Sequence, residues 1–559
     1  MKPKIVIYQL LPRLYGNLTT TGVIGGGIEQ NGCGRFSDLT AEVISQLKDL
    51  GVTHLWLTGV IRHATGTDYA GEGLPASHPG ILKGKAGSPY AINDYYDVDP
   101  DLALSVPDRF REFTELVDRI KASGLKVILD FVPNHLARDY ASRAKPAGTR
   151  DIGEDDDPTV PFHPDNNYYY LPGTQLYLNG YREEPARATG NDVFNPKPQP
   201  HDWYETVKLN YGADYRTGLT YFSPVPDTWQ KMTDMLSFWA GTGIDGFRCD
   251  MAGMVPVPFW AHSIGKIKRD HPGVIFIDEL YEPERYEAYV ETAGFDFLYD
   301  KAGFYDSARE VIAGRKRASE MTGLWRSLRG LDNKMVRFIE NHDEQRVASR
   351  EFAGESWPGL PALALAAFMN SGPVMLYAGQ EFGEPADPAS GCICADGRTT
   401  IFEYSFIPTI RNWLAGQLTE PEARHRQFTR LILNTLKDFP VLSDGQFYDL
   451  SFVNHDLDQG GTVCSFLRYY EVMREAREPA EYPGILLVAV CFDPAIHSAR
   501  VRVPHHALEV MGISGQERIR TSSIQPFSEN SQQLLSSQVV SSGIHIGFNP
   551  SGWAIIGIE

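Results

Sequence analysis

Four short apolar runs of this chain end on carboxylate or histidine side chains. They finish as Asp130-Phe131-Val132-Pro133-Asn134-His135, Gly246-Phe247-Arg248-Cys249-Asp250, Ile277-Asp278-Glu279-Leu280 and Glu340-Asn341-His342-Asp343. Because side chains alternate along a strand, Arg248 and Asp250 are expected on one side, where the guanidinium can keep the carboxylate ionised. Asp278 and Glu279 are adjacent and point opposite ways, so we expect Asp278 to be structural. The pattern predicts acidic side chains from separate segments meeting at one site.

The elements that must position these residues alternate between strands and helices. Short Val/Ile/Leu-rich runs and helical stretches such as Asp108–Ala122 and Trp229–Ala240 alternate through the first three quarters of the chain, which predicts parallel strands covered by helices. The expected strands are Lys4–Gln9, His54–Thr58, Lys126–Phe131, Gly246–Asp250, Val274–Glu279, Phe295–Tyr299, Val336–Glu340 and Val374–Tyr377. Eight such strands predict an α/β fold of the (β/α)₈ TIM-barrel type, whose functional groups project from the carboxyl ends of the strands.

Two departures from this repeat divide the 559 residues into domains. Roughly ninety residues separate the third strand from the fourth, too many for a structureless loop, which predicts an excursion domain there. After a helical stretch near Arg424–Lys437, short alternating runs predict a C-terminal antiparallel β-sandwich domain. The expected division is 1–135 and 227–443 for the two parts of the barrel, 136–226 for the excursion domain and 444–559 for the C-terminal domain.

The four segments, in this order, resemble the four signature regions of the α-amylase family of glycoside hydrolases. The resemblance extends to Tyr90-Ala91-Ile92-Asn93-Asp94-Tyr95, to Tyr8-Gln9 with Pro12-Arg13, and to Gly372-Pro373 through Gly379-Gln380-Glu381. It covers roughly residues 4 to 440. One Asp-x-x-x-Asn-His motif alone would be weak, whereas four ordered motifs on the matching strands are specific.

The resemblance implies a retaining enzyme that cleaves α-glucosidic bonds, α-1,4 in the first place, in glucans or maltooligosaccharides through a covalent glycosyl-enzyme. Asp250 would be the nucleophile, Glu279 the acid/base, and Asp343 a third carboxylate that binds hydroxyl groups and supports ring distortion. A retaining pair stands about 5 to 5.5 Å apart. We expect a low pKa at Asp250, held down by Arg248, and a protonated Glu279 in a less solvated setting near other carboxylates.

The resemblance also implies the residues that bind the sugar. Tyr90 matches a stacking tyrosine, and His135 and His342 would hydrogen-bond the same sugar. Asn134 matches a residue that in many members ligates a structural Ca²⁺ together with oxygens of the excursion domain. A local backbone cap is an equal alternative for Asn134. No organic cofactor is implied.

Each of these residues also has a structural alternative. Arg248 and Asp250 could be an ion pair that caps a strand, and the two histidines could be hydrogen-bonded core residues. The tyrosines 168–170 could stack a sugar, although packing of the excursion domain is the commoner use. The acidic run 154–157 predicts a solvated face, with metal binding the minor alternative.

Two positions depart from the family pattern. The Lys and His that follow the nucleophile by three and four residues are here Gly253 and Met254, which puts the leaving-group side and an endo-acting α-amylase in doubt. The Asp of exo-type pockets, three residues before the stacking tyrosine, is Gly87, so an α-glucosidase is not supported either. A transglycosylase with the same machinery remains an alternative. A non-catalytic glucan-binding scaffold is a third hypothesis, disfavoured because the full catalytic set is present.

The composition of the chain limits the classes of molecule that it is expected to bind. Lys+Arg 52 against Asp+Glu 71 gives a formal charge of -19, which repels nucleic acid and anionic membrane surfaces. The six cysteines fit neither a zinc pattern nor a disulfide framework, so we expect them reduced. No apolar run is long enough to span a membrane, and the start lacks a signal-peptide pattern. A cytoplasmic location is expected, although a secreted or periplasmic protein trimmed of its leader would look the same; the oligomeric state is left open.

Overall fold

A computed structural model describes residues 4–386, 396–455, 459–470, 484–524 and 531–559. Eight parallel strands form its central sheet, in the hydrogen-bonded order β17-β16-β15-β14-β5-β2-β1-β18. They are β1 (Val6–Leu10), β2 (His54–Leu57), β5 (Lys126–Phe131), β14 (Gly246–Cys249), β15 (Ile275–Asp278), β16 (Phe297–Tyr299), β17 (Met335–Val336) and β18 (Val374–Tyr377). A parallel bridge between Arg337 and Val374 joins β17 to β18 and closes the barrel. The predicted (β/α)₈ barrel is confirmed, although β17 is shorter than expected.

The interior of the barrel is filled by inward-facing side chains of its strands. Successive side chains alternate between the two faces of a strand, so each strand presents about every second residue inward. A buried cluster contains Ile7, Trp56, Ile128, Ile277, Tyr299, Val336, Phe338 and Met375. The barrel is therefore a packed core, and open space for a ligand is expected only at its ends.

Helices cover the outside of the barrel, and most of them are amphipathic. They include α3 (Ala41–Leu50), α4 (Arg109–Ala122), α5 (Asp227–Gly241), α6 (Val257–Asp270), α9 (Gly359–Phe368) and α11 (Glu420–Asp438). In α4 the buried residues Phe113, Leu116, Val117 and Ile120 recur at helical spacing and form one apolar face.

Helix α9 differs from the others because all ten of its residues are buried. It contacts α11 on one side and strand β21 (Ile485–Cys491) of the C-terminal domain on the other. Carbonyl groups at its C-terminal end accept hydrogen bonds from two distant cations: Lys4 donates to Ala367 and Asn370, and Arg468 donates to Met369. The start of the barrel and the C-terminal domain therefore both fasten to this helix.

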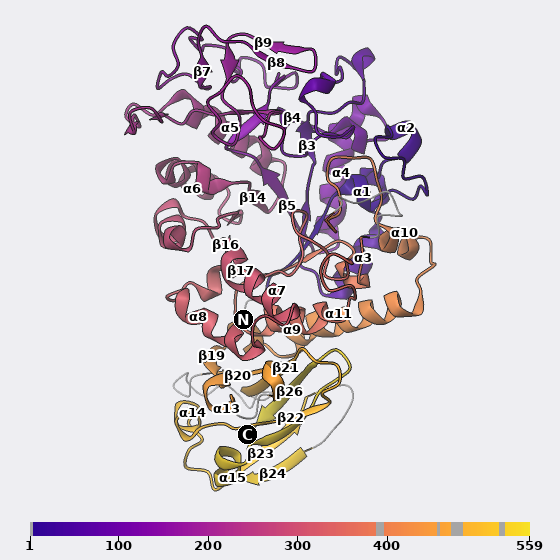
Figure 1. Ribbon diagram of the computed structural model, residues 1–559, viewed down its shortest axis with the longest axis vertical. Coiled ribbons are helices and arrows are strands. Elements are labelled where there is room, and N and C mark those ends of the chain that lie inside the picture. The colour runs from indigo at the N-terminus through magenta and orange to yellow at the C-terminus, as the bar shows by residue number, and fades with distance from the viewer. Residues whose placement is uncertain (1–3, 387–395, 456–458, 471–483, 525–530) are drawn as a thin grey trace.

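Between β5 and α5 the chain forms short antiparallel pairs, which lie at the top of Figure 1. The pairs are β6 (His135–Ala137) with β11 (Thr206–Lys208), β7 (Tyr170–Leu171) with β10 (Ala186–Arg187), β8 (Leu176–Leu178) with β9 (Tyr181–Glu183), and β12 (Ala213–Asp214) with β13 (Leu219–Thr220). In the first pair His135 lies opposite Lys208, so this excursion domain pairs directly with the chain that leaves β5.

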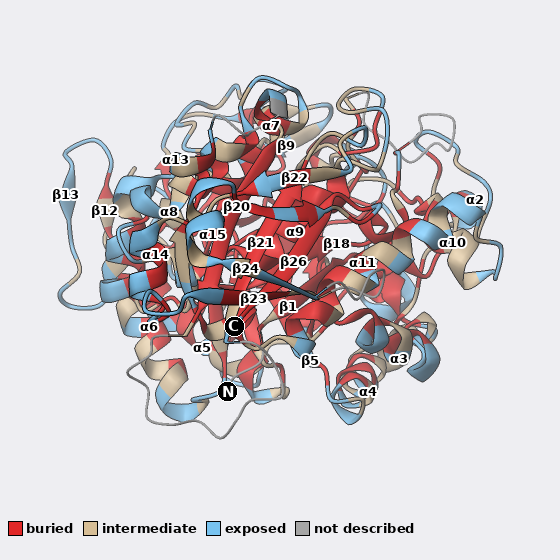
Figure 2. Cartoon of the chain, turned by 90° about the horizontal axis from the view of Figure 1, so that it is seen from below, coloured by how far each residue is buried: buried red, intermediate tan, exposed pale blue. Residues whose placement is uncertain are grey.

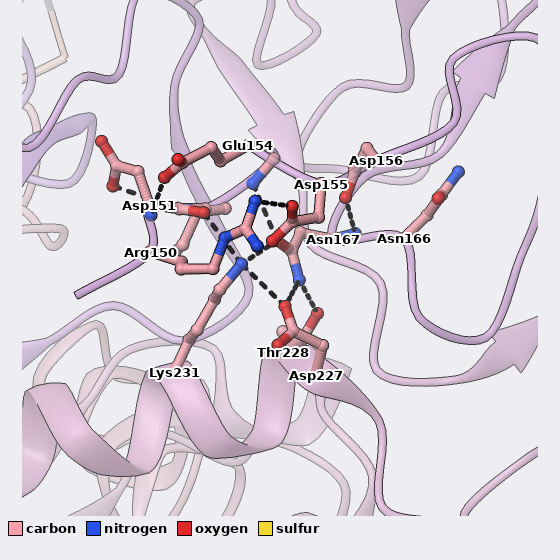
Figure 3. Close-up of polar contacts among 12 residues, drawn as sticks. Arg150, Asp151, Glu154, Asp155, Asp156, Asn166, Asn167, Asp227, Thr228 and Lys231 are labelled. Carbon is pink, nitrogen blue, oxygen red and sulfur yellow. Dashed lines mark hydrogen bonds and ion pairs between the residues drawn. The ribbon is translucent and has the colours of Figure 1, made fainter. Parts of the chain in front are cut away.

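A polar cluster fastens the acidic run of the excursion domain to α5 (Figure 3). The Lys231 ammonium lies 2.7 Å from Asp227 Oδ2 and donates to Asn167 Oδ1 at 2.9 Å. Asp156 accepts a hydrogen bond from the Asn167 backbone N–H at 2.7 Å, whereas the other three acids of the run, 154, 155 and 157, are exposed. In the described ranges, no group of three or more His, Cys, Asp or Glu side chains could hold a metal ion.

The C-terminal domain is an antiparallel sandwich. Its larger sheet has the order β19-β20-β21-β26-β23-β24, and β22 (Ser498–Val501) pairs with β25 (Ile544–Gly547) in the smaller sheet. The larger sheet contains β19 (Gln446–Asp449), β20 (Val463–Tyr469), β21, β23 (Arg518–Ser523), β24 (Ser531–Leu535) and β26 (Trp553–Ile558). Strands β20, β21 and β26 are buried in the middle of Figure 2, and the largely exposed strand β24 forms one edge of the larger sheet. The predicted antiparallel C-terminal sandwich is confirmed.

Two further predictions concern the chain as a whole. Cys33 and Cys249 carry free thiols, while Cys392 and Cys394 lie outside the described residues. No helix in the described part of the chain is both long and apolar enough to cross a membrane.

Candidate active site

A pocket of about 220 Å³ opens at the carboxyl ends of the barrel strands. Five of the residues singled out from the sequence line it: Tyr90, His135, Asp250, Glu279 and Asp343. Sequence reasoning missed several other lining residues, among them Lys83, Trp203, Glu205, Tyr281 and Phe402. The structure therefore brings one predicted side chain from each of the four segments into one pocket, and Trp203 and Glu205 of the excursion domain add to its wall.

Arg248 lies at the base of this pocket and is fully buried. Its Nη1 is 2.9 Å from Asp250 Oδ1 and its Nη2 is 2.6 Å from Glu279 Oε1. Nη1 also lies 3.2 Å from Asp130 Oδ1. Because one planar guanidinium contacts both Asp250 and Glu279, these two carboxyl groups face each other across the width of a single side chain. The predicted pairing of Arg248 with Asp250 is present, and it is part of a larger network.

The register of two neighbouring strands puts these carboxylates at the same level. Cys249 of β14 lies opposite Asp278 of β15, so Asp250 and Glu279 each follow the last residue of their strands. The close approach of the strands depends on Gly246, because a Cβ there would lie 2.7 Å from Ile275 Cγ1. Local sequence thus sets the geometry of the pair.

Both oxygens of Glu279 are held by neighbouring donors. Oε1 accepts from the Tyr281 hydroxyl at 2.7 Å, and Oε2 accepts from the Met251 backbone N–H at 2.8 Å. Met251 has a φ of 44°, a left-handed conformation that is costly for this residue type and that turns its N–H toward Glu279. Tyr281 stands two residues after Glu279, a spacing that could have flagged it as a neighbour.

The prediction of a low pKa at Asp250 is wrong. Burial and the negative charge of Glu279 raise the pKa of Asp250 well above its ordinary value, and Arg248 only partly offsets them. Asp250 Oδ2 is buried without a hydrogen-bond partner among the described residues. The sequence could not reveal this outcome, because the spacing of Arg248 and Asp250 says nothing about a third charge or about burial. Asp278 points away from the pocket, and burial raises its pKa as well.

Tyr90, His342 and Asp343 form one hydrogen-bonded wall. The rings of Tyr90 and His342 stack with centroids 5.3 Å apart, and His342 Nε2 lies 2.5 Å from the Tyr90 hydroxyl and 3.0 Å from Asp343 Oδ2. Burial and the charge of Arg248 lower the pKa of His342 to about 3, so this ring is neutral at physiological pH. His342 does not line the pocket; it lies behind Tyr90 and Asp343 and positions both.

His135 lines the opposite side of the pocket beside Trp203, whose ring centroid is 5.1 Å away. Burial and the nearby ammonium of Lys208 lower the pKa of His135 to about 3, so it too is neutral. Trp203 belongs to an irregular stretch of the excursion domain, where no periodic pattern could have identified it.

The side-chain oxygen of Asn134, which would ligate Ca²⁺, is bound by an ammonium group of the protein. Its Oδ1 accepts a hydrogen bond from the Lys208 ammonium, which also lies 2.9 Å from Asp192 Oδ1 and 3.5 Å from the Met254 carbonyl oxygen. Its amide donates to the Gly190 carbonyl at 2.8 Å. The oxygens that would attract Ca²⁺ already surround a cation of the chain itself, so the calcium hypothesis for Asn134 does not fit this donor set. The alternative of a local backbone cap does not fit either, because the carbonyl that the Asn134 amide reaches belongs to Gly190, 56 residues away.

Comparison with known proteins agrees with this geometry. The family model described as alpha amylase, catalytic domain, matches residues 29–393. Maltase A2 of Drosophila melanogaster is 25% identical over 325 residues, which cover 56% of this chain and 46% of the relative. An alpha-1,4-glucan:maltose-1-phosphate maltosyltransferase of Cereibacter sphaeroides is 24% identical over 279 residues, which cover 50% and 38%. The chain therefore spans less than half the length of these two relatives.

A solved structure gives the same result for the fold. The maltogenic alpha-amylase AmyB from Thermotoga neapolitana aligns with a TM-score of 0.61 and 22% sequence identity, covering 99% of both chains. At that identity the likeness concerns the fold alone, whereas the family model covers more than half of the sequence. The chain belongs to the α-amylase family.

Proposed function

We propose that this protein is a retaining glycoside hydrolase that cleaves α-glucosidic bonds, α-1,4 in the first place, in glucans or maltooligosaccharides. The observation that supports it best is the pair of carboxylates bridged by Arg248 at the floor of a pocket at the carboxyl end of the barrel. Asp250 and Glu279 come from adjacent strands and share one guanidinium, which holds the two carboxyl groups close together. A retaining mechanism needs such a closely spaced pair.

Asp250 acts as the nucleophile. Its Oδ2, which has no hydrogen-bond partner among the described residues, attacks the anomeric carbon while the glycosidic C–O bond breaks. Glu279 gives its proton to the departing oxygen. In the second half Glu279 takes a proton from water, the resulting hydroxide attacks the anomeric carbon, and the ester bond to Asp250 breaks. After hydrolysis of the glycosyl-enzyme, Asp250 is again ionised and Glu279 is again protonated, ready for the next substrate.

The raised pKa of Asp250 suits this role. In the empty pocket the ionised carboxylate is unfavourable, because burial and the charge of Glu279 both oppose it. A transition state with positive charge on the sugar ring relieves that unfavourable interaction, so the electrostatic stabilisation appears when the charge develops. Other residues that line the pocket bind the sugar. Tyr90 offers a ring face to it, and Asp343 and the neutral His135 bind its hydroxyl groups.

Transfer to a second sugar is the alternative, supported by the similarity to a maltosyltransferase. An exo-type pocket closed by an acid at position 87 is disfavoured, because Gly87 has a φ of 73° and a Cβ there would lie 1.8 Å from the Ala64 carbonyl oxygen. No structural calcium is proposed, because Lys208 occupies the relevant oxygens. The expected partner is an α-glucan, and the cytoplasmic location remains a prediction.

The test is a product analysis with an inactive control. Starch, pullulan, dextran, trehalose and maltoheptaose are incubated with the wild type and with Asp250→Asn. Glucose and short maltooligosaccharides from maltoheptaose indicate hydrolysis, and longer oligomers indicate transfer. The variant is expected to keep its circular dichroism spectrum and lose at least about a thousandfold in kcat. Full activity in it would rule out Asp250 as nucleophile.

A further inference from the structure

Arg13 is a buried cation that donates to two backbone segments far apart in the sequence. It lies in the short helix α1 (Pro12–Tyr15), which follows strand β1, and only 4% of it is exposed. Its Nη1 donates to the Ala86 carbonyl at 3.2 Å, and its Nη2 donates to the Ile401 carbonyl at 2.6 Å. A single planar guanidinium therefore joins the two segments.

Both of these segments form walls of the catalytic pocket. Tyr90, a few residues after Ala86, lines the pocket, and so do Ile401 and Phe402. The segments also touch directly, because the Ala86 N–H donates to the Phe402 carbonyl at 3.1 Å. Arg13 fastens this junction from a third segment of the chain, and it does not itself line the pocket.

The burial of this guanidinium is energetically unfavourable. Its hydrogen-bond partners are the two carbonyl groups and His63 Nε2, and its Nε has none among the described residues. His63 is neutral, because burial and the charge of Arg13 lower its pKa to about 4. Compensation by a carboxylate comes at longer range: burial raises the pKa of Asp99 to about 6, and the charge of Arg13 partly offsets this rise. A buried charge with neutral partners contributes little to stability, so we look for its role in what it holds.

We propose that Arg13 is a positioning residue that holds two walls of the catalytic pocket at the spacing that a sugar ring requires. It acts through the segments that carry Tyr90 and Ile401, and it does not touch the reacting bond. The inference deepens the proposed function and rests on it for the identity of the ligand, whereas the spacing of the walls is a property of the empty protein.

Loss of the guanidinium should weaken binding more than chemistry. A sugar that enters a pocket with loosened walls has to restore their order, and this ordering lowers the affinity. Asp250 and Glu279 stay bridged by Arg248, so the reacting pair keeps its arrangement. The expected signature is a rise in KM with a much smaller change in kcat.

The first experiment needs no ligand. Hydrogen exchange of the segments 84–90 and 399–405 is followed by mass spectrometry in the wild type and in Arg13→Met, where exchange should be at least about tenfold faster. Arg468→Met is the matched control, because Arg468 is also buried and also donates to backbone carbonyls, those of Met369 and Leu442. The control should leave exchange in these two segments unchanged. Unchanged exchange in Arg13→Met would overturn the proposal.

The second experiment measures steady-state kinetics with maltoheptaose. Arg13→Met should raise KM about tenfold and change kcat less than about threefold. Arg13→Lys keeps the charge but replaces the planar fork by a compact ammonium, so its KM should rise less, and it replaces Arg13→Met if that variant does not fold. Arg468→Met should keep its KM within about twofold. An equal rise in KM in Arg13→Met and Arg468→Met would overturn the proposal, because it would reflect lost stability alone.

A binding measurement separates this proposal from the proposed function. Maltoheptaose is titrated calorimetrically into the Asp250→Asn variant with and without Arg13→Met, and the affinity should fall about tenfold, equivalent to about 1.4 kcal/mol, when Arg13 is replaced. An unchanged affinity would overturn the positioning role. If the wild type turns over no α-glucan but binds maltoheptaose in a manner that depends on Arg13, the proposed function fails and the positioning role stands.

Discussion

Replacement of Lys208 by Met tests whether a side chain of the protein replaces a metal ion between the excursion domain and the barrel. The substitution keeps a long apolar stem and removes only the ammonium. In the wild type that ammonium joins Asn134, which follows β5, to Asp192 of the excursion domain and to the Met254 carbonyl of the candidate nucleophile loop. Its loss therefore uncouples three segments at once.

The size of the effect follows from the burial of each partner. Asn134 is fully buried, and a buried acceptor left without a donor costs about 1 to 3 kcal/mol. The Asp192 side chain is 35% exposed, so water recovers part of the energy of its lost partner, and the 3 to 5 kcal/mol typical of a broken buried pair is an upper bound. We expect the variant to lose about 2 to 4 kcal/mol of unfolding free energy.

Urea unfolding of the wild type and of Lys208→Met measures this loss, with and without EDTA. Lys266→Met is the matched control, because Lys266 pairs with Asp234 at 3.2 Å on the surface and should contribute less than about 1 kcal/mol. The wild type is expected to be indifferent to EDTA and to added Ca²⁺. A wild-type protein that EDTA destabilises and Ca²⁺ restores, or a Lys208→Met variant as stable as the control, would refute the reasoning.

Three further predictions concern the catalytic pocket. Because the pKa of Asp250 is raised, the acidic limb of kcat/KM should lie above the ordinary carboxyl range near pH 4; a limb below pH 4 would contradict it. A raised folded-state pKa means that the ionised Asp250 carboxylate destabilises the fold at neutral pH but not at low pH. Asp250→Asn should therefore be more stable than the wild type at pH 7 and lose that advantage on acidification. Thermal unfolding of both proteins at neutral and at acidic pH would show this. Arg248→Lys removes one or more of three carboxylate contacts and should lower kcat/KM at least about a hundredfold with substrate affinity less affected, whereas near-normal steady-state kinetics would show that the bridge is dispensable.

The barrel and its carboxylates could be predicted from sequence because the responsible signals are local. Apolar runs mark buried strands, and the residue that follows such a run must lie at the end of the barrel. Asp250 and Glu279 were placed by that rule, and the structure puts both in one pocket. The excursion and C-terminal segments were found from spacing and alternation, although the exact domain boundaries remain predictions.

The features that could not be predicted depend on contacts between distant segments. Lys208 contacts Asn134 although 74 residues separate them, and no motif around either residue predicts this contact. Trp203 lines the pocket from an irregular stretch without periodicity. The direction of the Asp250 pKa shift required the positions of Glu279 and Arg248 together with the extent of burial, because the three effects oppose one another.

The buried helix α9 makes the order of synthesis matter. Lys4 leaves the ribosome long before Arg468, yet both donate to carbonyl groups at the end of this helix. Until β20 and β21 have been made, α9 has an uncovered apolar side and incompletely satisfied carbonyls in a barrel that already holds every candidate catalytic residue. A chain that stops before β20 would therefore contain all the chemistry and still be prone to aggregate, which makes the terminal sandwich a folding requirement for the barrel.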